Sequence, residues 1–292
     1  MEIIVEIGTE EQKELIKKDL QIIDVVHTAL KGKARLHVIV PEDFDATVNR
    51  LEGTDGYVSG RESCVVMGKH IPTGDSTYLV FSKTLFNNRF SEFFRLHAYL
   101  HELFHSLNSY RFPDLKTTSA SGGRYLVYLN IFFDEFYVEK KTTELILGLC
   151  PKVSFRGKKE YCRAMRDFVK TALDEKYYSE LKENIERYFL HRNVRVLHKD
   201  IEETFDGVAK AIVYAYAFMS NSSRFDKYHD RIKGSHFVNN KTIVLINYFS
   251  AKYGNNSFDL SDGVPLMADF LENFGIRYED GAGGLLCHVK RI

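Results

Sequence analysis

The sequence has no long apolar run and no excess of charge of either sign. No stretch of its 292 residues contains the roughly eighteen consecutive apolar residues that a membrane-spanning helix needs. The chain begins without a basic segment followed by a long apolar one, so we expect no signal peptide and a cytoplasmic location. Forty basic residues balance forty acidic ones. This balance argues against a nucleic-acid partner and against attraction to an anionic membrane.

Cysteines are few, and none of them form a close pair. Cys64, Cys150, Cys162 and Cys287 lie far apart without a Cys-x-x-Cys motif, which argues against a disulfide framework and against a thiolate zinc site. Apolar residues make up 44% and charged residues 27% of the chain, as in ordinary folded proteins. A chain of this length forms either one large domain or a domain with a second lobe.

Hydrophobic periodicity predicts an α+β protein. Strands are expected at residues 3–5, 35–40, 64–67 and 77–81, the last two paired as a hairpin, with an amphipathic helix at residues 10–30. Helical periodicity then predominates, with runs at residues 90–110, 124–149, 158–189, 201–219, 241–253 and 265–274. Pro151 is expected to end the second run. We therefore predict a lobe over residues 1–155 with a small mixed sheet, followed by a mainly helical lobe over residues 156–292.

A His-Glu-x-x-His pattern lies within the first long helical run. Because His101 and His105 are four residues apart, both imidazoles project from one helix face and can bind one zinc ion, with Glu102 beside it. A catalytic zinc site leaves one position for water, and Glu102 is placed to accept the proton of that water. The apolar residues of the same helix form a separate stripe: Phe93, Leu96, Leu100, Leu103, Phe104 and Leu107. His97 extends the histidine row and is expected to support the site without binding the ion.

The next helical run supplies candidates for a third protein ligand. Glu135 fills a gap in a mostly apolar stripe and should therefore be buried. The residues of this stripe are Tyr128, Ile131, Val138, Thr142, Leu145 and Leu149. A buried carboxylate needs a proton, an ionic partner or a metal. A zinc ion would meet this need, and so would Arg124 or a basic residue of the helical lobe. Glu139, offset by about 40° on the helical wheel, is the alternative ligand.

These residues resemble the gluzincin metallopeptidases, in which a glutamate on the helix after the His-Glu-x-x-His motif is the third zinc ligand. Within that class, Glu135 to Glu139 followed by Pro151 resembles the corresponding helix of the ImmA/IrrE-type metallopeptidases. The resemblance implies a zincin-like fold with His101, His105 and Glu135 as zinc ligands and Glu102 as catalytic base. The chain departs from that pattern at Val138, where the family has alanine, and at Glu139, where it has Asn or Asp. In such folds the strand before the metal helix binds the substrate, which here points to residues 77–81.

The sequence thus predicts a zinc-dependent metallopeptidase that hydrolyses peptide bonds of a peptide or protein substrate. The alternative is a zinc-stabilised regulatory or interaction domain that keeps the scaffold without turnover, and the presence of Glu102 favours the enzyme. A Tyr or His outside the ligand helices is expected to stabilise the oxyanion. The sequence does not rank the candidates: Tyr178, Tyr188, His191, His198, Tyr214, Tyr216, His229 and His236.

Overall fold

The computed structural model describes most of the chain. It covers residues 1–60, 66–87, 90–108, 111–113, 119–153, 155–172, 175–221, 232, 235–282 and 284–292. The chain divides into two compact units: Met1–Tyr110 with Lys141–Tyr161, and Arg111–Lys140 with Cys162–Ile292. Each unit combines two separate stretches of chain and is described by itself. The two-lobe division at residue 155 remains a prediction.

The first unit is built on a four-stranded mixed sheet with the order β1-β2-β4-β3. The strands are β1 (Glu2–Val5), β2 (Arg35–Val40), β3 (Gly68–Thr73) and β4 (Ser76–Phe81). Strands β1 and β4 both run parallel to β2, whereas β3 runs antiparallel to β4. A small mixed sheet in an α+β protein was predicted and is confirmed.

The prediction that residues 77–81 form the substrate edge is wrong. Strand β4 pairs with β2 on one side and with β3 on the other, so it lies inside the sheet, and β3 is the edge strand on its side. The partner strand of this hairpin was expected at residues 64–67, of which residues 64 and 65 lie outside the described part of the chain, but β3 begins at Gly68. Only Ile71 of this strand enters the apolar core, and Gly68 and His70 occupy its other face. An edge strand with a single core residue lacks the alternating pattern that marks a half-buried strand.

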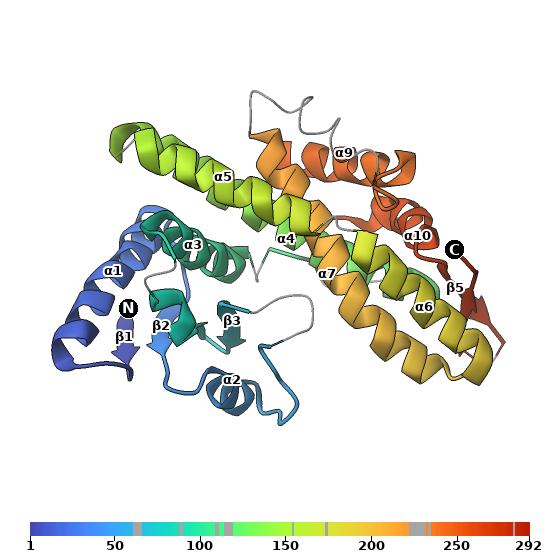
Figure 1. The fold of residues 1–292 in the computed structure, drawn as a ribbon, viewed down its shortest axis with the longest axis horizontal. Coiled ribbons are helices and arrows are strands. Elements are labelled where there is room, and N and C mark those ends of the chain that lie inside the picture. Colours follow the sequence, from blue (N-terminus) through green and yellow to red (C-terminus); the bar gives the residue numbers. More distant parts are fainter. Residues whose placement is uncertain are drawn as a thin grey trace. The chain divides into compact units, whose positions relative to one another are not determined.

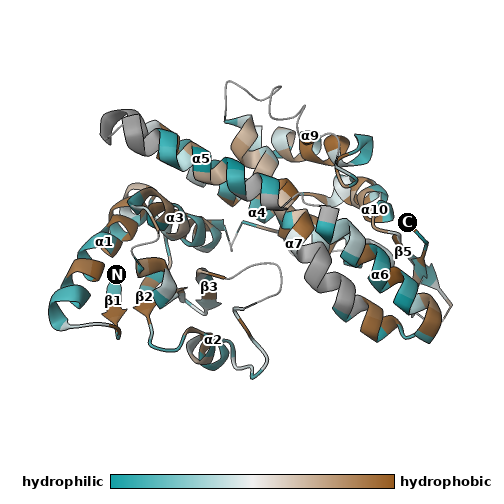
Figure 2. Cartoon of the chain, in the orientation of Figure 1, coloured by the Kyte–Doolittle hydropathy of each residue, from teal (hydrophilic) through white to brown (hydrophobic). Residues whose placement is uncertain are grey.

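Helices cover both faces of this sheet (Figure 1). They are α1 (Glu10–Ala29), α2 (Phe44–Glu52) and α3 (Glu92–Asn108), with the short 3-10 helix η1 (Lys83–Phe86) before α3. Phe44 and Val48 of α2 pack with Ile71 and Val80 on one face. On the other face, the ring of Phe81 meets a buried tyrosine of α3. The strands β1 and β2 are mainly hydrophobic, and α1 carries residues of both kinds (Figure 2).

Hydrogen bonds to one carboxylate link helix α3 to α1. The Asp19 carboxylate accepts hydrogen bonds from Arg95 Nε and from the hydroxyl of Tyr99, both at 2.9 Å. Burial and the neighbouring carboxylate raise the pKa of Tyr99 well above its ordinary value, so its hydroxyl stays protonated and donates.

Helix α1 begins with a capping box, in which Thr9 and Gln12 satisfy each other's backbone N–H groups.

The second unit is mainly helical, as predicted for this part of the chain. The long helix α4 (Ala120–Val153) contributes to both units and continues past Pro151, which was expected to end it. The helices that follow are α5 (Phe155–Ala172), α6 (Glu175–His191), α7 (Val194–Ser220), α9 (Asn240–Gly254) and α10 (Val264–Glu272), with η2 (Ser261–Gly263) before α10. The run predicted at residues 158–189 is thus two helices.

Aromatic side chains of α4 form much of the core of this unit. The rings of Phe133 and Phe136 contact Phe249 of α9, and the ring of Phe132 contacts Phe270 of α10. A hairpin of β5 (Ile276–Gly281) and β6 (Gly284–Val289), which the periodicity did not predict, joins the start of α4 through Tyr125. Among the described residues, no helix combines the length and the apolar character needed to cross a membrane.

Candidate metal centre

Helix α3 positions the His-Glu-x-x-His residues as its sequence predicts. Four leucine and phenylalanine side chains of the predicted stripe are buried: Leu100, Leu103, Phe104 and Leu107. This stripe holds one side of the helix in the core, while His101 and Glu102 on another side are only half-buried. The two histidines and the glutamate are therefore carried on a helix that is fixed by its own apolar residues.

The two imidazoles are spaced as ligands of a single ion. The Nε2 atoms of His101 and His105 lie 3.1 Å apart. Two nitrogens bound tetrahedrally to zinc at 2.0–2.1 Å would be separated by roughly 3.3 Å. The separation of the pair thus comes within a few tenths of an ångström of that between two zinc-bound nitrogens.

Other side chains of the same unit hold these rings in place. The ring of His70, on β3, stacks on that of His105 with centroids 5.5 Å apart and an interplanar angle of 13°. The ring of His97 stacks on that of His101 at 6.0 Å, and His97 Nδ1 is hydrogen-bonded to the Tyr161 hydroxyl at 2.8 Å. His97 therefore contacts the site, and its supporting role stays a prediction, whereas His70 was not identified from the sequence.

Both candidate acidic ligands on α4 are buried. Glu135 is 8% exposed, as predicted, but Glu139 is even more deeply buried at 1%. The helical wheel separated the two because it assumed one apolar stripe along α4. In the structure Ile131 of that stripe is exposed, while Phe132 and Tyr137, which lie outside it, are buried. A helix buried on several sides has no single apolar face, so its sequence cannot rank the two carboxylates.

Glu135 has polar partners within its own unit. The ammonium of Lys210 lies 3.1 Å from Glu135 Oε1, and the hydroxyl of Tyr214 donates a hydrogen bond of 2.6 Å to Oε2. The two partners stand one turn apart on α7 and so hold both oxygens of the carboxylate. The alternative in which a basic residue of the helical lobe pairs with Glu135 is thus present, although the sequence did not single out Lys210. Tyr214 was among the candidate hydroxyls.

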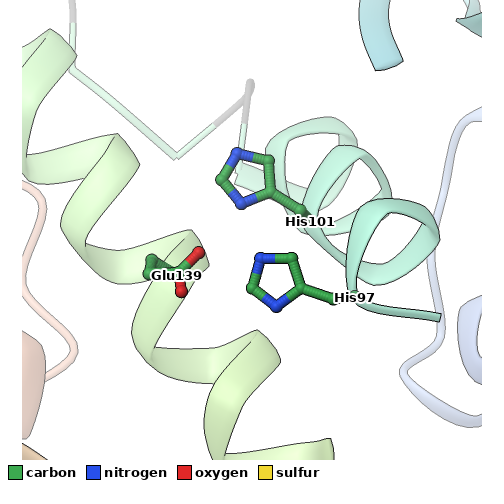
Figure 3. A group of neighbouring side chains, drawn as sticks. All are labelled: His97, His101 and Glu139. Carbon is green, nitrogen blue, oxygen red and sulfur yellow. The ribbon is translucent and has the colours of Figure 1, made fainter. Parts of the chain in front are cut away.

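Two groups of side chains in the described part of the chain offer three metal-ligand atoms each. One comprises His101, His105 and Glu135, and the other comprises His97, His101 and Glu139; the ligand atoms of each group lie within 4.8 Å of one another. Figure 3 shows the second group, with the rings of His97 and His101 directed toward the Glu139 carboxylate. Two imidazoles with one carboxylate are a donor set suited to zinc, so the residues present fit the predicted ion.

Comparison with models of known families, with curated proteins and with solved structures yields no match for this chain.

Proposed function

We propose that this protein is a zinc-dependent metallopeptidase, with a zincin-like fold in the part that carries α3. The observation that supports this most directly is the 3.1 Å separation of the Nε2 atoms of His101 and His105 on a helix that also bears Glu102. Glu135, whose side chain offers an oxygen within 4.8 Å of both nitrogens, is the proposed third ligand. A cytoplasmic location is part of the same proposal.

Each residue has a distinct task in this proposal. His101, His105 and Glu135 would hold the ion, which would act as a Lewis acid toward a carbonyl group and make water more acidic. Glu102, which is not a ligand, accepts the proton of the attacking water and delivers it to the leaving amine. The Tyr214 hydroxyl orients the Glu135 carboxylate, the kind of support that a metal-binding carboxylate requires. The ammonium of Lys210, in contrast, would compete with the ion for the same carboxylate.

The proposed substrate is an extended peptide that pairs with β3. This strand is at the edge of the sheet, and a peptide can add to such an edge through backbone hydrogen bonds. One face of β3 meets both functional residues of α3, since Gly68 lies against Glu102 and His70 against His105. A peptide bound along β3 would therefore be held beside the proposed base.

The substitution Glu102→Gln tests the proposal. Glutamine has nearly the same shape, so the fold and a content of one zinc per chain should be retained, while turnover should fall on the order of a hundredfold. Zinc is measured by elemental analysis, and turnover by the new termini that mass spectrometry detects in a denatured-protein library. A wild-type protein that binds no zinc after metal-replete purification would refute the metal site.

The same experiment separates the enzyme from a zinc-stabilised domain without turnover. Such a domain needs the three ligands but not a carboxylate at Glu102, so wild type and Glu102→Gln would then carry equal zinc and both leave the library uncut. The enzyme predicts cleavage by wild type alone, abolished by a chelator.

A further inference from the structure

Gly68, at the start of the edge strand β3, makes unusually close contact with Glu102. A Cβ atom built on Gly68 would lie 2.7 Å from Glu102 Cγ, 3.1 Å from Oε1 and 3.2 Å from Cδ. Real Cβ atoms do not approach other carbon atoms to 2.7 Å. The Glu102 side chain therefore lies along the backbone of β3 in a space that exists only because position 68 has no side chain.

The backbone of Gly68 does not itself require glycine. Its φ angle is outside the left-handed region, unlike those of Gly53 and Gly74, which lie in turns. Gly68 pairs with Phe81 in the antiparallel ladder, a setting in which alanine is tolerated and usually preferred to glycine. The close approach of Glu102 is thus the feature of the structure that calls for glycine at this position.

We propose that Gly68 is a positioning residue that fixes where the carboxylate of Glu102 lies. Any larger residue at position 68 displaces that carboxylate from β3. This inference rests on the proposed function, in which Glu102 is the general base, and extends it to a residue outside the proposed ligands and base. A base displaced by about 1 Å loses on the order of a hundredfold in rate, so even alanine should have a large effect.

The contact itself is tested by a stability cycle that needs neither zinc nor substrate. Thermal midpoints are measured for wild type, Gly68→Ala, Glu102→Ala and the double variant. The change in midpoint caused by Gly68→Ala should be less favourable in the protein that has Glu102 than in the Glu102→Ala variant. The two changes should differ by about 2 °C or more. Gly56→Ala is the matched control, because a Cβ at Gly56 meets no atom within 4 Å. Equal shifts in both backgrounds would overturn the proposal.

The positioning role is tested by structure and turnover. A crystal structure of Gly68→Ala should show the strand in place and the Glu102 carboxylate moved, with the zinc content of wild type. Turnover should fall tenfold to a hundredfold, while Gly56→Ala stays at the wild-type rate. If Glu102→Gln abolishes cleavage but Gly68→Ala does not, this inference fails and the metallopeptidase stands. If wild type binds no zinc, the proposed function fails whatever the stability cycle shows.

Discussion

In the proposed site, Lys210 would compete with the zinc ion for Glu135, so Lys210→Met should tighten zinc binding. The Glu135 side chain is 11% exposed and that of Lys210 is 29% exposed, with 3.1 Å between the charged atoms. Breaking a buried ion pair costs about 3–5 kcal/mol, and the partial exposure of the lysine reduces this to about 2 kcal/mol for the zinc-free protein. A bound zinc ion would neutralise the carboxylate instead, so the zinc-loaded variant should lose little stability.

Thermodynamic linkage converts this difference into affinity. The Lys210→Met variant loses about 2 kcal/mol of stability only in its zinc-free form. It should therefore bind zinc roughly thirtyfold more tightly than wild type. The affinity is measured by competition with a chromophoric chelator at constant pH, and the stability by denaturant unfolding with and without zinc.

The matched control is Lys241→Met, which breaks an ion pair with Glu272 of 3.0 Å in the same unit. Because that pair is more exposed, its loss should cost at most about 1 kcal/mol and leave zinc affinity unchanged. If zinc affinity falls or stays the same in Lys210→Met, then Lys210 and zinc do not compete for Glu135.

Three further predictions use the same assays. Glu135→Ala should weaken zinc binding at least tenfold and Glu139→Ala much less, and the opposite ranking would assign the ion to the group that contains His97. Tyr214→Phe removes the 2.6 Å hydrogen bond to Glu135 and should weaken zinc binding about tenfold without loss of fold, whereas an unchanged affinity would remove this hydroxyl from the site. Asp19→Ala removes the acceptor of the hydrogen bonds from Arg95 and a buried tyrosine, so the free energy of unfolding should fall by about 2 kcal/mol. Zinc content should stay constant, and a loss of zinc would contradict this prediction.

Where an element carries its own apolar pattern, its position could be read from the sequence. Helix α3 is the best example, because its buried leucines recur at helical spacing and thereby place the two histidines on another side. Strands β2 and β4 contain continuous apolar runs and were also located correctly. Strand β3 was misplaced and helix α2 was missed. The strand presents only one residue to the core, and the helix has just nine residues, too few for a clear period.

The sequence by itself therefore determined the α+β class, the helix with its His-Glu-x-x-His residues, and two candidate carboxylates on the next long helix. These features depend on spacing along one chain segment, which helical geometry converts directly into position. Only the tertiary structure brought Lys210 and Tyr214 to Glu135, stacked His70 on His105, and laid Glu102 against Gly68. Those contacts join segments 30 or more residues apart, and no local pattern records which of the many histidines, lysines and glycines will meet.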